Sequence, residues 1–182
     1  MRKKIDLKIA YRLINHGPLV VVSSLYNEKV ALTPIAWHMP ISDDPPLIGL
    51  AIWEGHFVYK AIAQTGDFVV NIPSSDMAEM VRKLGSVSGH KVDKCKKYGA
   101  RVERSKEVRS PRLCSAIAVL ECKVRKDTHL SDTYNIILGD AVYAEAERAA
   151  FTNRWLPEKS SFKTLHHLGD TIFCVPDKRV LR

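Results

Sequence analysis

Three positions in this sequence carry side chains that are suited to ligand binding. Trp37 follows a run of apolar residues and offers a flat face on which a ring can stack. His56 stands where a helix is predicted to begin, and the unsatisfied N–H groups of a helix start favour an anion. Lys94 follows a glycine-containing loop and adds a positive charge. The residues by themselves leave plainer roles open: a half-buried tryptophan on a strand, a surface histidine, and the first lysine of a solvated run over residues 94–97.

The cysteines and histidines do not form a recognisable metal site. The chain has four cysteines, with no C-x-x-C pair and no histidine at zinc-finger spacing: Cys95, Cys114, Cys122 and Cys174. His166 and His167 are neighbours, and neighbouring side chains of an extended chain point to opposite sides. We therefore expect free thiols, no metal, and a role in packing or in a dimer contact for the two histidines.

Charge and hydropathy limit the class of protein. Lys and Arg number 28 against 20 Asp and Glu, a net charge of +8 that favours phosphates, nicotinamide dinucleotides or nucleic acid as partners. The basic residues lie in small scattered groups without interleaved aromatics, which favours a solvated surface over nucleic-acid binding. The basic start is not followed by an apolar run, and no apolar stretch approaches the ~20 residues that cross a bilayer. We expect a cytoplasmic protein without membrane segments.

The hydrophobic pattern predicts one domain over residues 1–182, built mainly from strands. Apolar runs predict strands over residues 18–26, 29–37, 47–53, 67–73, 117–124 and 134–144. Residues 27–28 and 43–46 are typical of turns, and the last two strands are expected to pair around residues 126–133. Several antiparallel strands with short helices between them indicate a closed or nearly closed barrel.

Two short helices are predicted between the strands. The first begins at His56 and ends at Gly66, a residue that suits a helix end. The second is capped by Ser75 and runs to Gly85. The pattern weakens towards the C-terminus, so we expect residues 153–182 to be a mostly irregular tail that packs on the barrel or on a partner subunit.

Four motifs follow one another between residues 10 and 170. They are T-P-I-A-W with I-S-D-D-P-P (33–46), T-G-D-F-V-V-N (65–71), S-G-H-K-V-D-K (88–94) and L-H-H-L-G (165–169). In this order and spacing they resemble the flavin reductase-like family, to which the flavoredoxins are related. The resemblance implies a mainly β (α+β) fold that binds FMN: an antiparallel Greek-key split β-barrel with short peripheral helices.

The resemblance also implies which residues contact FMN. Along the isoalloxazine ring would lie Thr33, Pro34, Ile35, Ala36, Trp37 and His38, with the indole stacked on the ring. His56 and Tyr59 would donate to the phosphate, although the threonine or serine that the family often has near Val58 is absent here. The remaining expected contacts are Asn71, Ser88, Asp93 and Lys94, with the lysine reaching either the phosphate or the charge of the reduced flavin.

Some flavin reductases carry G-D-H in the hairpin before the last barrel strand, close to the nicotinamide. The similar stretch here, residues 126–130, contains His129 but lacks the glycine. His129 is the catalytic residue expected of a reductase, whereas the missing glycine favours an electron carrier without a nicotinamide pocket.

The resemblance leads to one main hypothesis and leaves two others open. In the main hypothesis, NADH or NADPH passes electrons through FMN to a flavin, a metal chelate or a protein acceptor. In the second, a flavoredoxin-type carrier holds FMN and does not react with a nicotinamide. In the third, a basic split barrel binds nucleic acid without flavin. The resemblance also implies a homodimer with the FMN site in a groove between the subunits.

Overall fold

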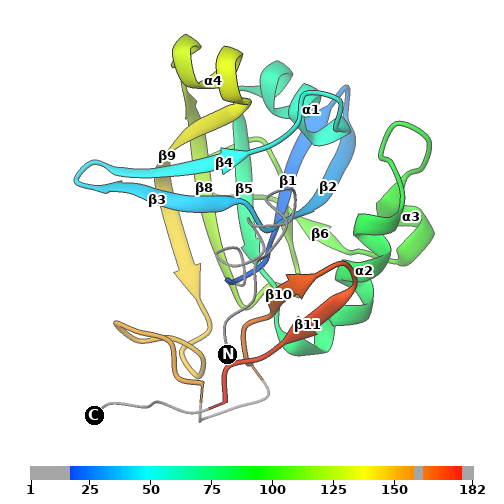
Figure 1. Ribbon diagram of the computed structural model, residues 1–182, viewed down its shortest axis with the longest axis vertical. Helices are drawn as coiled ribbons and strands as arrows, with labels where there is room; N and C mark the ends of the chain where they lie inside the picture. Colours follow the sequence, from blue (N-terminus) through cyan, green and yellow to red (C-terminus); the bar gives the residue numbers. More distant parts are fainter. Residues whose placement is uncertain (1–16, 158–161, 178–182) are drawn as a thin grey trace, which may run out of the picture.

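The computed structural model describes residues 17–157 and 162–177 and is built around one curved sheet (Figure 1). Neighbouring strands of this sheet are antiparallel, in the order β2-β1-β5-β8-β9-β4-β3. The strands are β1 (Val20–Tyr26), β2 (Lys29–Ile35), β3 (His38–Asp43), β4 (Pro46–Ala51), β5 (Asp67–Ile72), β8 (Ala118–Arg125) and β9 (Ile136–Ala146). The prediction of a mainly antiparallel β fold is confirmed.

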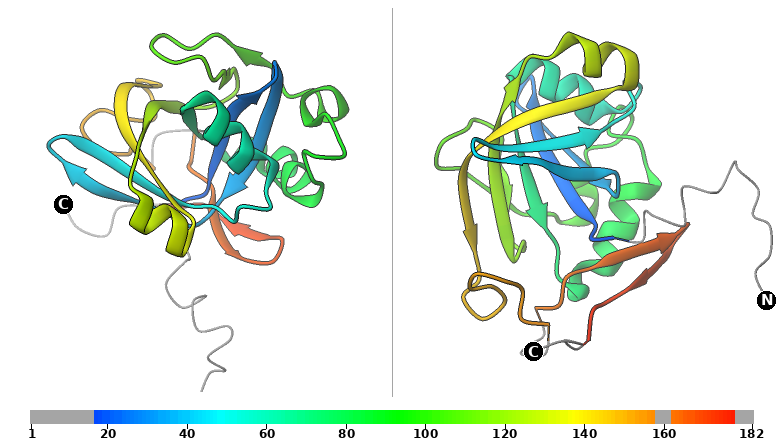
Figure 2. Two further views of the ribbon diagram at one scale, coloured as in Figure 1. Left: turned by 90° about the horizontal axis from the view of Figure 1, so that it is seen from above. Right: turned by 60° about the vertical axis from the view of Figure 1, so that its left-hand side comes forward.

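Short helices and two small hairpins surround the sheet (Figure 2). The helices are α1 (Phe57–Thr65), η2 (Ser75–Met77), α2 (Ala78–Ser86), α3 (Lys94–Tyr98) and α4 (Thr128–Tyr134). The hairpins pair β6 (Val102–Glu103) with β7 (Arg112–Leu113) and β10 (His166–Gly169) with β11 (Ile172–Cys174). Helices α1 and α4 lie at one end of the sheet, and α2 and α3 lie beside β2. None of the described helices is long and apolar enough to span a bilayer.

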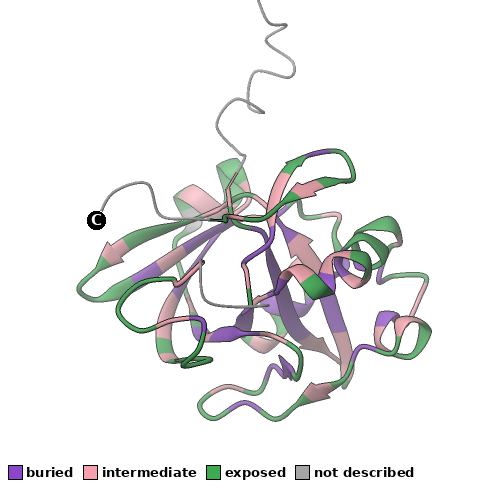
Figure 3. Ribbon diagram, turned by 90° about the horizontal axis from the view of Figure 1, so that it is seen from below, coloured by how far each residue is buried: buried purple, intermediate pink, exposed green. Residues whose placement is uncertain are grey.

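Strand β1 separates two hydrophobic cores. Successive side chains of a strand point to opposite faces. Val20 and Val22 therefore pack inside the curved sheet, whereas Leu19 and Val21 belong to the outer core with residues of α2. All four are at most 5% exposed. Seen from below, the buried stretches of the strands lie around the interior of the sheet (Figure 3). Burial on both faces explains why this strand is a continuous apolar run rather than an alternating one.

The first hairpin and the first helix form as predicted. β1 and β2 pair in register from Val20 opposite Ile35 to Tyr26 opposite Lys29, and the two turn residues between them have positive φ. Helix α1 ends at Gly66, whose φ of 74° lies in the left-handed region that glycine adopts without strain. Turn chemistry and glycine position were therefore sufficient to define these elements.

In the first half, one strand was not predicted and one helix cap was predicted wrongly. Residues 38–43 form the edge strand β3, which the sequence hides because Pro40 interrupts the apolar pattern. An edge strand tolerates proline, since one side of it has no partner strand. Ser75 does not cap a helix through its side chain. It is the first residue of η2, whose N-cap position is Ser74, and no side-chain cap hydrogen bond forms there.

Two predictions in the second half also need correction. The connection between β8 and β9 contains helix α4, begun by Asp127, whose carboxylate accepts the N–H of Leu130 at 3.0 Å. Strand β9 therefore starts at Ile136, not at Tyr134. The prediction of a mostly irregular C-terminal tail needs one addition, because β10 and β11 form a hairpin within its described part. Residues 158–161 and 178–182 of the predicted tail lie outside the described residues.

The buried amide of Asn71 joins three strands. Its Nδ2 donates to the carbonyl oxygen of Val21 and to Oγ of Ser23, both at 2.9 Å and both in β1. Its Oδ1 accepts the N–H of Leu113 in β7 at 2.7 Å. Asn71 is completely buried. The side chain thus satisfies polar groups that water cannot reach.

We predict that Asn71→Ala lowers the free energy of unfolding by about 3 kcal/mol, because each buried polar group left unsatisfied costs about 1–3 kcal/mol. Urea denaturation followed by circular dichroism measures the change. The matched control is Asn153→Ala at an exposed position, expected to stay within about 0.5 kcal/mol of the parent chain. A loss below about 1 kcal/mol in Asn71→Ala would show that the network is not important for stability.

Candidate functional site

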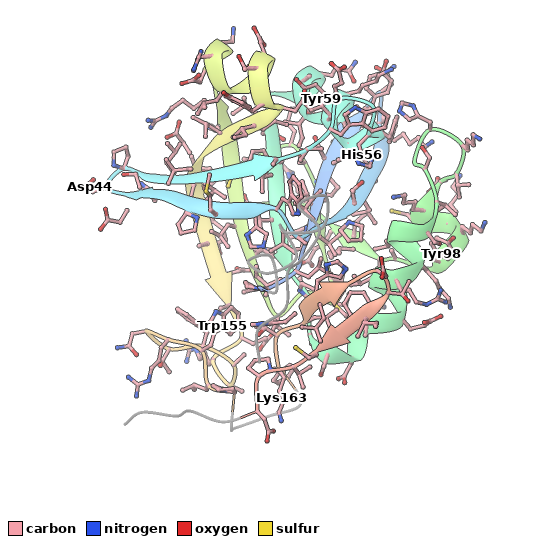
Figure 4. All side chains as sticks on the ribbon, in the orientation of Figure 1. Asp44, His56, Tyr59, Tyr98, Trp155 and Lys163 are labelled. Carbon is pink, nitrogen blue, oxygen red and sulfur yellow. The ribbon has the colours of Figure 1, made fainter. Side chains whose placement is uncertain are left out.

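The beginning of α1 is a positively charged site. His56 occupies the N-cap position with an extended backbone, no side-chain cap hydrogen bond forms there, and the first turn contains no acidic residue. Such a helix start favours an anion. Figure 4 shows His56 at the start of α1. Burial lowers the pKa of His56, and the positive charges of Lys94 and His90 lower it further. An anion bound here would relieve that repulsion.

The loop between α2 and α3 packs against this helix start. A Cβ on Gly89 would lie only 2.8 Å from the ring of Phe57, so the close approach requires glycine. Lys29 holds the same loop, since its Nζ donates to the carbonyl oxygen of Gly89 at 2.6 Å and lies 4.7 Å from the centroid of the Phe57 ring. His90 follows, with Nε2 3.2 Å from the carbonyl oxygen of Gly55. The loop therefore brings a second imidazole to the site.

Lys94 anchors the far end of the loop. Its Nζ donates to the carbonyl oxygens of Leu32 in β2 at 2.8 Å and Leu84 in α2 at 2.6 Å. Lys94 is 4% exposed, and this burial lowers its pKa to about 8. Lys94 is thus not the first residue of a solvated run. The neighbouring Asp93 caps α3 by accepting the N–H of Lys96 at 3.1 Å.

One exposed tryptophan, Trp53, lies beside the helix start, and a second, Trp37, lies next to the segment that leads to it. Trp37 is 52% exposed and Trp53 is 64% exposed. The carbonyl oxygen of Trp37 accepts the N–H of Ala51 at 3.0 Å, which places Trp37 next to the segment that leads to Trp53. The ring of Trp53 lies over Gly55, where a Cβ would be 2.4 Å from the indole, and its centroid is 5.6 Å from that of His56. Flat aromatic surface therefore adjoins the cationic site.

The structure brings together several residues that the sequence singled out. Contacts link the segments of Trp37, His56 and Lys94, although these lie far apart in the chain. Ser88 belongs to the same group, because its Oγ accepts the N–H of His90 at 3.3 Å. His38 lies next to Trp37, with Nε2 2.8 Å from the carbonyl oxygen of Pro18. Thr33 is half-buried and directly follows Leu32, whose carbonyl oxygen accepts a hydrogen bond from Lys94.

Other predicted residues lie elsewhere. The amide of Asn71 is used inside the fold, and the side chain of Ile35 belongs to the core inside the curved sheet. The side chain of Asn71 is thus occupied by bonds inside the fold, and Ile35 could contact a cofactor only through its backbone, so both contacts stay predictions. His129 is exposed on α4, so its catalytic role stays a prediction.

Three further predicted residues line two separate cavities. Pro34 and Ala36 line a cavity of about 280 Å³ between β2, α2 and the β10–β11 hairpin. Tyr59 lines a cavity of about 200 Å³ between α1 and the β8–α4–β9 connection. Alternation along β2 explains the first case, because the side chains of Pro34 and Ala36 point away from the interior that Ile35 faces.

Three residues of the site were missed in the sequence: Lys29, Trp53 and His90. His90 lies inside the motif of residues 88–94, at a position where the motif prescribes no residue type. Lys29 and Trp53 meet the site at Gly89 and Gly55. The two glycines were the available signal, since glycine often marks a close approach of the backbone to another group.

The curved antiparallel sheet with its peripheral helices is a split barrel, as comparison with solved structures shows. The FMN-binding domain of a flavin reductases-like enzyme from Shewanella baltica superposes with a TM-score of 0.87 at 22% identity, covering 98% of this chain and 95% of that chain. Flavoredoxin of Desulfovibrio vulgaris gives 0.85 at 17% identity, covering 100% and 97%. A putative flavin reductase with a split barrel domain from Shewanella frigidimarina gives 0.80 at 16% identity, covering 98% and 93%.

Sequence comparison then assigns the family. The family described as "Flavin reductase like domain" matches residues 11–166. The uncharacterized protein YddH of Escherichia coli is 31% identical over 180 residues, which cover 97% of this chain and 95% of that protein. The chain therefore belongs to the flavin reductase-like family, and the resemblance seen in its motifs is confirmed.

We predict that the buried amine of Lys94 makes stability depend on pH. Its pKa is about 8 in the folded chain and has its ordinary, higher value in the unfolded chain. Between these two values the unfolded chain binds more protons, so the contribution of Lys94 to stability rises as the pH increases above about 8. Urea denaturation of the parent chain and Lys94→Met between pH 7.5 and 9.5 measures the difference, where the substitution removes this rise.

The control is Lys96→Met, two residues along the same helix, where the side chain is 88% exposed. This variant should follow the pH dependence of the parent chain. Parallel curves for the parent and Lys94→Met would contradict the lowered pKa of the buried amine.

Proposed function

We propose that the chain binds FMN and acts as an oxidoreductase in which NADH or NADPH reduces the flavin and a flavin, a metal chelate or a protein accepts the electrons. The observation that carries the proposal is that the imidazoles of His56 and His90 and the indole of Trp53 lie together at the start of α1, on a flavin reductase-like barrel. The similar domain from Shewanella baltica is described as FMN-binding, which supports the same cofactor here.

The residues at the site fit the two ends of FMN. A phosphate dianion requires N–H donors and positive charge, which the start of α1, His56 and the loop at Ser88 supply. A three-ring flavin requires flat apolar surface, which Trp37 and Trp53 supply. The first turn of α1 contains no acidic side chain that would repel the phosphate.

The protein's part in the reaction is to bind, orient and tune. When bound, FMN supplies the chemistry of hydride acceptance and onward electron transfer. The start of α1 would hold the phosphate end, and the indoles would shield one side of the ring from water. Lys94 is buried and has a structural role, because its bonds to the carbonyl oxygens of Leu32 and Leu84 join the start of α3 to β2 and α2. No side-chain acid or base is required for these tasks.

A second candidate is an FMN electron carrier of the flavoredoxin type. His129 is exposed on α4, and the glycine that accompanies it in some reductases is absent. The superposition on flavoredoxin of Desulfovibrio vulgaris is nearly as close as that on the Shewanella baltica domain. A carrier would bind FMN at the same site as the proposed reductase and would differ from it only in not reacting with a nicotinamide.

We predict that the purified chain, titrated with FMN, shifts the visible flavin spectrum and quenches flavin fluorescence. Stopped-flow mixing of the loaded protein with NADH and NADPH should then bleach the flavin absorbance, because a bound flavin is held ready for hydride transfer. Bleaching by dithionite but by neither nicotinamide would replace the reductase with the carrier. A chain that leaves the FMN spectrum unchanged at every protein concentration would contradict both.

We also propose a homodimer. Strand β3 is an edge of the sheet, and on or beside it Trp37, Met39 and Ile41 are between 42% and 52% exposed. Exposed edge strands with apolar side chains are normally covered by another chain or element. Light scattering after size exclusion should give twice the chain mass of 20.5 kDa. A monomer that carries a full complement of FMN would contradict the dimer.

A further inference from the structure

The ring of His90 is held firmly at the start of α1. Its Nε2 is 3.2 Å from the carbonyl oxygen of Gly55, and its centroid lies 5.2 Å from that of Phe57 at an interplanar angle of 71°. Its own backbone N–H bonds to Oγ of Ser88. Gly89, directly before it, packs against Phe57 without room for a Cβ. The contacts with Gly55 and Phe57 therefore orient this imidazole, although the residue itself is exposed.

The charges around His90 favour an anion as its missing partner. After burial, the positive charges of Lys94 and His90 both lower the pKa of His56, so these three side chains share one electrostatic environment. Lys29 from β2 reaches the same loop. The nearby carboxylate of Asp93 is directed to the cap of α3 and to Lys96. The other charged side chains on the adjoining segments are exposed: Glu54, Lys60 and Lys91.

The contact with Gly55 decides which nitrogen of His90 carries the proton. A carbonyl oxygen only accepts hydrogen bonds, so Nε2 must be the N–H donor in this contact. In the neutral ring Nδ1 then holds a lone pair, which repels a phosphate oxygen. Nδ1 becomes a donor only when the ring takes up a second proton.

We propose that His90 is a phosphate-binding residue of the FMN site and binds the phosphate as an imidazolium, so that FMN binding takes up a proton at Nδ1. This inference rests on the proposed binding of FMN. It makes His90 a residue that selects the phosphorylated flavin, because riboflavin has no group to hold the second proton in place. The preference for FMN over riboflavin therefore decreases as the pH rises.

Calorimetric titration of the full chain with FMN, in buffers of different ionisation enthalpy at pH 7.5, counts the protons taken up. The parent chain should take up protons with FMN and none with riboflavin. His90→Gln keeps an N–H donor for Gly55 but cannot become charged. It should take up at least about half a proton less and bind FMN about tenfold more weakly, as expected for loss of a charge-assisted hydrogen bond. Its affinity for riboflavin should change less than about twofold, since riboflavin lacks the phosphate that the imidazolium binds.

Lys91→Gln is the matched control, because Lys91 is exposed on the same loop and carries a charge that does not titrate at this pH. It should keep the proton uptake of the parent chain. An unchanged proton count and an unchanged FMN affinity in His90→Gln would overturn the role of His90 while leaving FMN binding intact. A parent chain that binds neither flavin would overturn the proposed function together with this inference.

Discussion

The buried ammonium group of Lys94 bonds to the carbonyl oxygens of Leu32 and Leu84 and thereby joins β2, α2 and α3. An amine in this position has lost most of its hydration, and the two carbonyl bonds offset part of that loss. Lys94 begins α3 directly after the loop that carries His90. Its two hydrogen bonds therefore fix the position of the C-terminal end of that loop. The site at the start of α1 depends on the position of this loop, because His90 reaches Gly55 from it.

Close contacts between glycine backbone and aromatic rings also hold the loop and the helix start together. Gly89 and Gly55 allow the rings of Phe57 and Trp53 to lie directly on the chain, so the loop, the helix start and one indole form a continuous surface. Two acidic groups of the surrounding elements have structural tasks. Asp93 caps α3, and Asp67 accepts the N–H of Ser110 at the other side of β1. Positive charge therefore accumulates at the helix start without a carboxylate in its first turn.

This distribution of charge has a functional consequence. The split barrel is common to proteins whose descriptions differ, from a flavin reductase to a flavoredoxin, so the fold does not select among activities. The selection lies in the groups around the bound molecule. In this chain the groups at the candidate site are imidazoles, a buried amine and an exposed indole, and burial lowers the pKa of His56 and of Lys94. In the proposal for His90, recognition of an anionic ligand is coupled to protonation.

The sequence by itself determined the strand-rich architecture, the β1–β2 hairpin, the end of α1 at Gly66 and the membership suggested by four ordered motifs. Each of these depends on residues that are close in the chain, through side-chain alternation or the backbone freedom of glycine. Only the tertiary structure decided that Lys94 is buried, that Asn71 belongs to the interior, and that His90 meets Gly55 across 35 positions. Such contacts arise when distant segments close on one another, and no local pattern specifies which side chains then share a surface.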